Sequence, residues 1–373
     1  MDLLAEATRQ RNAGRPVISM AVGQPGNPAP QAALQAARAA LDHGRIGYTD
    51  ALGLADLRAR LAAHYQRRHG LAVDPARVIV TTGSSAGFNL AFLALFDAGE
   101  AVAIARPGYP AYRAILSALG LRVIEVPVNA ETQFTLTPES LEAAQTQAGV
   151  RLKGVLLASP ANPTGTVTGR DQLRAVYDYC RGQGIALISD EIYHGLTYAG
   201  EETTALQIGD EAIVINSFSK YYCMTGWRIG WMVVPDHIVR PLECLAQSLY
   251  ISAPELSQIA AIAALDAEDE LEHYKASCRT NRDFLMTRLP ELGLPLLSPM
   301  DGAFYAYVDA GRYTNDTMAF ARRMLAEIDV AATPGMDFDP IDGHRALRIS
   351  YAGTHAEMVE ATDRMGRWLG TQK

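Results

Sequence analysis

The segment "GVLLASPANPTGTVTGRDQLRAVYDYCRGQGIALISDEIY", residues 154–193, contains the pattern that decides the fold. Two short apolar runs, 154–160 and 185–189, flank an amphipathic stretch at 170–184. Apolar strands separated by a helix are typical of a parallel sheet that is covered on both faces. Because functional groups in such folds lie outside the carboxyl ends of the strands, we expect polar site residues directly after each run.

The same alternation extends from about residue 77 to residue 235. Further strand-like runs stand at 77–81, 101–105, 121–127, 212–216 and 229–234. Together the runs predict an α/β fold with a mostly parallel seven-stranded sheet flanked by helices. A long helical region follows at 236–292, and the chain ends in a strand–helix–strand–helix pattern. We expect a large domain over 41–280 and a smaller α+β domain, built from 281–373 together with the N-terminal part, 1–40.

Composition narrows the class of protein. The 373 residues carry a formal net charge of −8 and no extended cluster of Lys and Arg, which argues against a nucleic-acid partner. No apolar run is long enough to cross a bilayer, and the N-terminus lacks the pattern of a signal peptide. The four cysteines are scattered and the eight histidines form no HxxxH or HExxH pair. We therefore expect a cytoplasmic protein with no disulfide frame, no protein-built metal site and no membrane partner.

Small and polar residues follow the expected strands where a site would form. The turn that starts at Gly83 opens a helix, and its free backbone N–H groups can bind a phosphate, although such a turn can also serve only as a helix cap. Tyr109 follows a Pro-Gly turn and either covers a flat ring or packs. Asn162 stands in a proline-framed turn. Asp190 ends an apolar strand, where a carboxylate is costly unless a positive group meets it.

A lysine occupies a similar setting in "NSFSKYYCMTGWRIGW", residues 216–231, where Lys220 has mostly uncharged neighbours. A buried lysine is easily lowered in pKa and forms a Schiff base with an aldehyde. Pyridoxal 5'-phosphate (PLP) needs such a lysine and a carboxylate facing its ring nitrogen. It also needs donors for its phosphate, a partner for its phenolic oxygen and an aromatic ring over its face. The strand ends offer one candidate for each, so the sequence predicts an enzyme that uses PLP.

The chain also resembles the class I/II, fold-type I PLP-dependent aminotransferases, the aspartate aminotransferase superfamily. The matching stretches cover nearly the whole length in the family's order: "VGQPG", "GYTDALGLADLR", "TTGSSAGFNLAF", "RPGYPAY", "SPANPTG", "SDEIY", "SFSKYYCMTGWRIGW", "DGAFYAYVD" and "ALRISYA". The resemblance implies a fold-type I PLP transferase that moves the α-amino group of an amino acid to a 2-oxo acid. Both half-reactions would share one pocket, which implies ping-pong kinetics.

The resemblance also implies a role for each residue at a matching position. Lys220 would be the Schiff-base and proton-transfer residue, and Asp190 would pair with the ring nitrogen. Tyr193 and Asn162 would hydrogen-bond the phenolic oxygen, and Tyr109 would stack on the ring. The phosphate ligands would be Ser84, Ser85, Ala86, Ser217 and Arg228, with Tyr48 donated across the interface of a homodimer. Arg348 would hold the α-carboxylate of the substrate, in a pocket shared with Gly23, Tyr109 and Asn162.

Alternatives stay open on three points. A PLP-dependent C–S lyase or decarboxylase on the same fold keeps the same lysine, aspartate and arginines, and a non-catalytic PLP-binding regulatory module keeps the fold. Ser85 stands roughly where aspartate-specific relatives carry a lysine, which favours a neutral or apolar amino acid as substrate. Relatives usually have about a dozen more residues before the stretch that opens this chain, which leaves the start site and some dimer contacts open.

Overall fold

The seven runs predicted to be strands form one sheet in the computed structural model, which describes residues 2–371. The strands are β2 (Val78–Thr81), β3 (Ala101–Arg106), β4 (Arg122–Pro127), β5 (Leu152–Ala158), β6 (Ala186–Asp190), β7 (Ile213–Ser217) and β8 (Gly230–Val233). Their order is β2-β8-β7-β6-β5-β3-β4, and β8 runs antiparallel to both of its neighbours. The predicted α/β fold with a mostly parallel seven-stranded sheet is confirmed.

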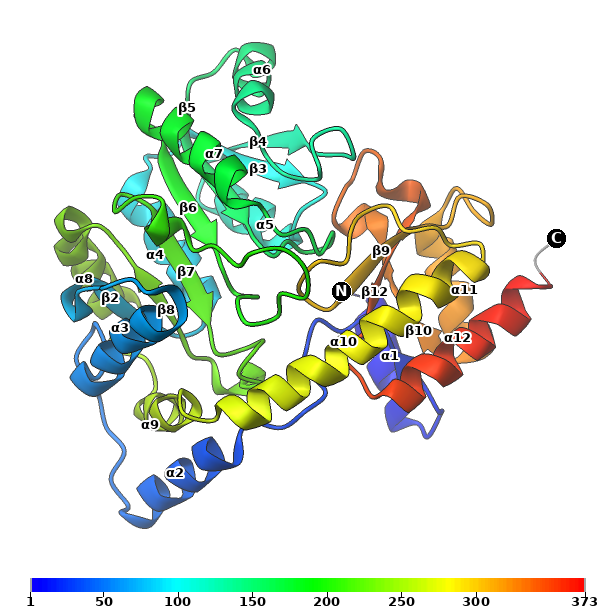
Figure 1. Ribbon diagram of the computed structural model, residues 1–373, viewed down its shortest axis with the longest axis horizontal. Helices are drawn as coiled ribbons and strands as arrows, with labels where there is room; N and C mark the ends of the chain where they lie inside the picture. Colours follow the sequence, from blue (N-terminus) through cyan, green and yellow to red (C-terminus); the bar gives the residue numbers. More distant parts are fainter. Residues whose placement is uncertain (1, 372–373) are drawn as a thin grey trace.

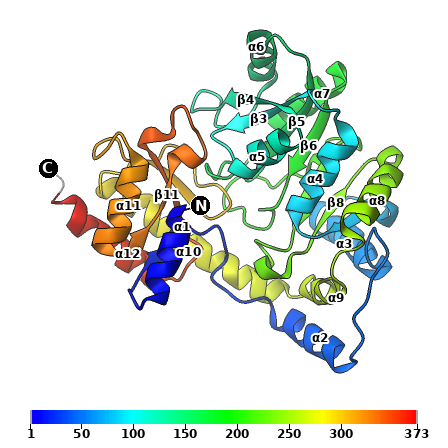
Figure 2. The same ribbon diagram turned by 180° about the vertical axis from the view of Figure 1, so that it is seen from behind.

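Helices cover both faces of this sheet, as Figures 1 and 2 show from opposite sides. One layer contains α4 (Ser84–Leu95), α5 (Pro110–Ala118) and α8 (Asp236–Tyr250), and the other contains α3 (Ala55–His69), α6 (Pro138–Ala148) and α7 (Arg170–Gln183). Side chains alternate along each strand, so Val102 and Ile104 pack with the first layer while Ala101 and Ala103 pack with the second. Because both faces are buried, the strands read as nearly continuous apolar runs.

A smaller lobe follows the sheet along the chain. Its antiparallel sheet contains β9 (Tyr305–Asp309), β12 (Ala346–Ser350) and β11 (Thr333–Pro334), and its helices are α11 (Thr317–Ile328) and α12 (His355–Leu369). The N-terminal elements α1 (Asp2–Asn12) and β1 (Ile18–Ser19) lie here too, because β1 pairs with β10 (Val330–Ala331). Short 3₁₀ helices occur along the whole chain, at Pro75–Arg77, Ala205–Gln207 and Thr225–Trp227 between elements of the central sheet and at Gly335–Asp337 and Gly343–Arg345 in the smaller lobe.

The helical region after β8 divides into α8, α9 (Glu255–Ala264) and the long α10 (Glu268–Glu291). In Figure 1, α10 runs from the large lobe to the small one, and α2 (Gln31–Asp42) lies against α9. We keep 1–40, 41–280 and 281–373 as the proposed division of the chain, with α10 crossing residue 280 as one continuous helix. Within residues 2–371 no helix is long and apolar enough to span a membrane.

Candidate active site

The carboxyl edge of the central sheet brings together residues from several strands. Asn162 follows β5, Asp190 is the last residue of β6, and Lys220 follows β7. Arg228 reaches the same edge from the start of β8, because that antiparallel strand pairs its first residue with the last residues of β7 and β2. The parallel topology therefore gathers side chains that are far apart in the sequence, as expected for a fold of this type.

Lys220 is half-buried at the centre of this group. Its Nζ donates a hydrogen bond to the carbonyl oxygen of Gly23 at 2.5 Å and lies 5.8 Å from the centre of the Tyr193 ring. Burial lowers the pKa of Lys220 to about 8, helped by the positive charge of Arg348 and opposed by Asp190. A large share of the amine is therefore neutral and nucleophilic in the weakly alkaline range.

Asp190 is a buried carboxyl group, with 3% of its surface exposed. Its Oδ1 accepts the backbone N–H of Ile192 at 3.0 Å, and its Oδ2 accepts the hydroxyl of Tyr112. Burial raises the pKa of Asp190 to about 6, while the Tyr112 and Ile192 hydrogen bonds lower it. The sequence did not single out Tyr112, although it lies on the first turn of α5, three positions after Tyr109.

Arg348 comes to the site from β12 of the smaller lobe. Its guanidinium lies between two aromatic rings, 4.3 Å from the centre of Tyr305 and 4.8 Å from that of Phe338. Nη1 donates to Oδ1 of Asn162 at 3.1 Å and Nη2 to the carbonyl oxygen of Ala21 at 2.6 Å. Nε is buried without a partner, and the described residues give this guanidinium no ion pair. An unpaired buried guanidinium fits an incoming carboxylate.

The turn before α4 is shaped to receive an anion. Gly83 has φ of 76°, and a Cβ there would lie 2.5 Å from Nη2 of Arg228, so the guanidinium sits directly over the turn. Gly83 has no side chain and therefore cannot cap the first N–H groups of α4, which an anion can bind. A cation beside a helix N-terminus is unfavourable unless an anion lies between them. Ser84 is half-buried here, Ser85 exposed and Ala86 buried.

Ser217 lies buried at the end of β7, within 2.9 Å of the Ser219 hydroxyl and 3.0 Å of the Ile229 carbonyl oxygen. Tyr193 is buried, and its hydroxyl lies 2.7 Å from that of Tyr305. Tyr305 also explains why position 23 is a glycine, because a Cβ there would lie 2.5 Å from the Tyr305 hydroxyl. The sequence did not single out Tyr305, although it lies in the matching stretch "DGAFYAYVD".

Two expected site residues have exposed side chains in the single chain. Tyr48 is 82% exposed, in the segment between α2 and α3. Tyr109 is 39% exposed and makes an edge contact with Tyr112, with ring centres 5.3 Å apart. The single chain therefore assembles the lysine, the carboxylate and the two guanidinium groups, and leaves Tyr48 facing outward.

Comparison with known proteins identifies the arrangement. The sequence model described as "Aminotransferase class I and II" matches residues 15–365. The chain belongs to this family. The valine–pyruvate aminotransferase of Mycobacterium tuberculosis is 48% identical over 99% of this chain and 95% of the relative. The family expected from the sequence, and its amino-acid aminotransferase activity, are confirmed.

Solved structures agree with the aminotransferase fold. The crystal structure of an aminotransferase from Mycobacterium tuberculosis superposes with a TM-score of 0.96 at 46% identity, covering 100% of this chain and 96% of that one. Aspartate aminotransferase from Thermus thermophilus with maleate has a TM-score of 0.91 at 32% identity, covering 98% and 95%. The prediction of fold type I is confirmed.

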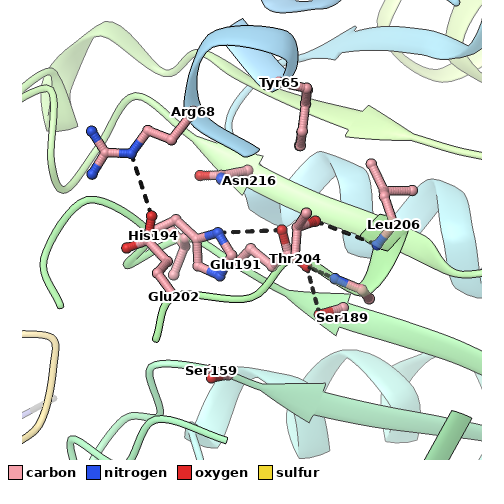
Figure 3. A network of polar contacts seen from close by, with 12 residues as sticks. Tyr65, Arg68, Ser159, Ser189, Glu191, His194, Glu202, Thr204, Leu206 and Asn216 are labelled. Carbon is pink, nitrogen blue, oxygen red and sulfur yellow. Dashed lines mark hydrogen bonds and ion pairs between the residues drawn. The ribbon is translucent and has the colours of Figure 1, made fainter. Parts of the chain in front are cut away.

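A polar network holds the segment of this aminotransferase that carries Asp190 and Tyr193 (Figure 3). Glu191, buried beside Asp190, accepts hydrogen bonds from Ser189 and the Ala205 backbone, and lies 3.4 Å from Nδ1 of His194. Glu202 accepts the N–H of Gly195 at 2.6 Å and contacts Arg68 of α3 at 3.4 Å. Burial works against ionisation of Glu202, but His194 and Arg68 hold its pKa down to about 2.

The same network places three potential metal ligands together. Side-chain atoms of His69, His194 and Glu202 lie within 4.8 Å of one another in the described part of the chain. Sequence spacing could not show this group, because His69 ends α3 while the others follow β6. Arg68 and the N–H of Gly195 already bind the carboxylate of Glu202. We therefore assign the three side chains a structural role, which is to hold the segment that follows β6 in place.

Proposed function

We propose that this aminotransferase binds PLP at Lys220 and exchanges the amino group between a neutral amino acid, with valine the first candidate, and pyruvate. The observation that carries the proposal is the shared edge on which a low-pKa lysine, a buried carboxylate and an unpaired guanidinium meet. The substrates are suggested by the 48% identical valine–pyruvate aminotransferase and by Ser85, a neutral residue in the glycine turn.

The residues of the edge fit PLP in number and chemistry. Bound PLP withdraws electrons from the carbon that carries the amino group. Asp190 offers a negative charge for the ring nitrogen, and Asn162 and Tyr193 offer hydrogen-bonding groups for the phenolic oxygen. The phosphate would take the place between Arg228 and the start of α4, with Ser84, Ser85, Ala86 and Ser217 as further ligands. Tyr109 would cover the ring.

Lys220 has a second role in this proposal, as the group that moves the α-proton of the amino acid. A general base works best when its pKa lies near the working pH, and the pKa of about 8 meets that condition. Arg348 would hold the α-carboxylate and so orient the α-carbon toward this amine, with Gly23 leaving room beside it.

Capture of PLP by the apoprotein should follow the ionisation of Lys220. Imine formation requires the neutral amine, so the rate should rise about tenfold per pH unit below pH 8 and level off above it. Stopped-flow absorbance measures the rate, and N-acetyl-lysine measured in parallel corrects for the ionisations of PLP itself. A corrected rate that still rises at pH 10 would show an ordinary lysine and contradict the proposal.

Arg348→Lys should weaken the binding of both substrates. The fork of a guanidinium binds a carboxylate through two parallel hydrogen bonds, and an ammonium does not. We expect kcat/KM for the amino acid and for the 2-oxo acid to fall by about 30- to 300-fold, mainly through KM. The matched control is Arg345→Lys, three positions before Arg348, whose half-exposed side chain pairs with Asp309. Equal effects of the two substitutions would count against a carboxylate-binding role.

We also propose a homodimer in which Tyr48 enters the phosphate site of the second subunit. Tyr48 is 82% exposed in one chain, and other large apolar side chains are exposed as well, among them Leu41 at 56% and Ile46 at 42%. Exposed apolar groups of this kind mark interaction surfaces. Light scattering tests the dimer.

We place the enzyme in the cytoplasm, since its four cysteines are unpaired, as in reducing compartments.

A panel of amino acids tests the function as a whole. The purified protein is mixed with valine, alanine, methionine, phenylalanine and aspartate, and conversion of bound PLP to the pyridoxamine form is followed by absorbance. We expect valine to react fastest and pyruvate to reverse the change. A conversion that is fastest with aspartate would contradict the proposed substrate. Ammonia and pyruvate released from a cysteine thioether would indicate a lyase instead.

A further inference from the structure

Tyr112 is a buried phenol that the proposed function leaves without a role. It is 5% exposed, on the first turn of α5, and its ring packs edge-on against Phe88 and Tyr109, with centres 5.3 Å away in each case. Its hydroxyl donates a hydrogen bond to Oδ2 of Asp190. The ring and the hydroxyl therefore have separate partners, and the hydroxyl faces the carboxylate that is proposed to meet the ring nitrogen.

Asp190 has few other groups that favour its charge. The hydrogen-bond donors found for it in the described chain are the Ile192 backbone N–H at Oδ1 and the Tyr112 hydroxyl at Oδ2. Lys220 acts on it from a distance, and the neighbouring Glu191 acts against its ionisation. A hydrogen bond to a charged group is stronger than one between neutral groups, so the phenol stabilises the carboxylate more than the acid.

We propose that Tyr112 is a positioning residue that keeps Asp190 ionised and aimed at the ring nitrogen of the cofactor. The inference rests on the proposed role of Asp190 toward PLP. A phenol suits the task because its donor is fixed by a rigid ring that packs against Phe88 and Tyr109. The raised pKa of Asp190 agrees with a carboxylate that needs this support at neutral pH.

The test is Tyr112→Phe, which retains the ring between Phe88 and Tyr109 and removes only the hydroxyl. Wild type and variant are loaded with PLP labelled with ¹⁵N in the ring, and the nitrogen signal is recorded by NMR. We expect the signal to move toward that of the unprotonated ring in the variant, and the Kd for PLP to rise about 10- to 100-fold. The control is Tyr313→Phe, which removes a hydroxyl bonded to the Leu292 carbonyl in the smaller lobe and should change neither value.

A second variant keeps the test decisive if Tyr112→Phe does not fold. With 3-fluorotyrosine at position 112 the phenol is a stronger donor, so the nitrogen signal should move in the opposite direction. A purely structural role would give no such pair of opposite shifts. An unchanged signal with the fluorinated residue, or with a folded Tyr112→Phe protein, would overturn the inference.

The same spectra separate this inference from the proposed function. A wild-type protein that binds no PLP would refute the proposed function. A wild-type protein with an unprotonated ring nitrogen would refute the role of Asp190, and with it the role of Tyr112. A protonated nitrogen in both wild type and Tyr112→Phe would refute the role of Tyr112 alone.

Discussion

Replacing Lys220 with alanine is expected to lower the rate of transamination by about 10⁵-fold or more. The substitution removes both functions proposed for this side chain, the covalent attachment of PLP and the movement of the α-proton. The other cations near it are the guanidinium groups of Arg348 and Arg228, and neither side chain carries the primary amine that both functions require. Single-turnover conversion of an amino acid to its 2-oxo acid measures the loss.

The matched control for this prediction is Lys153→Ala. Lys153 lies on β5 with 47% of its side chain exposed and pairs with Glu100 at 3.5 Å, so its loss should change the rate less than twofold. A second measurement adds methylamine, which can supply an amine in the space left by the lysine. Partial rescue by methylamine would support proton transfer by Lys220, and unchanged turnover of the alanine variant would overturn the mechanism.

Asp190→Asn should lower kcat/KM by about 10³-fold while leaving the apoprotein at least as stable. The amide has the shape of the carboxylate but no charge to hold a proton on the ring nitrogen. In the apoprotein that charge is a cost, because burial raises the pKa of Asp190 from 3.8 to about 6. The folded state thus binds the proton more tightly than the unfolded state, and ionised Asp190 destabilises the fold at pH values above 6.

Asp190→Asn should therefore lower the activity of the enzyme but should not lower the stability of the apoprotein. Chemical denaturation of the apoprotein at pH 8 should show a free energy of unfolding no lower than that of the wild type, and higher by up to about 3 kcal/mol. The activity loss then cannot be assigned to unfolding. A variant that keeps wild-type activity would contradict the role of Asp190. A marked fall in stability would show instead that the Tyr112 and Ile192 hydrogen bonds require the charge.

Much of the candidate site could be predicted from the sequence because β5, β6 and β7 each have a proposed site residue at or shortly after their carboxyl end. Asn162 after β5, Asp190 at the end of β6 and Lys220 after β7 needed only the strand pattern and the rule that parallel strands end at one edge. Arg348 came from the family resemblance, since nothing in its strand reveals a site. Tyr48 remains a prediction, because it faces outward from a single chain.

The sequence by itself determined the sheet, the edge that holds the site and the kind of chemistry, because these depend on local hydrophobic patterns and on residues adjacent to them. Only the tertiary structure decided which groups touch. The Arg348–Asn162 hydrogen bond joins residues 186 positions apart, and the Tyr112–Asp190 hydrogen bond joins residues 78 positions apart. Such contacts depend on how helices and lobes pack against the sheet, and a local pattern does not encode that packing. Burial follows from the same packing, so the lowered pKa of Lys220 and the raised pKa of Asp190 are properties of the folded chain alone.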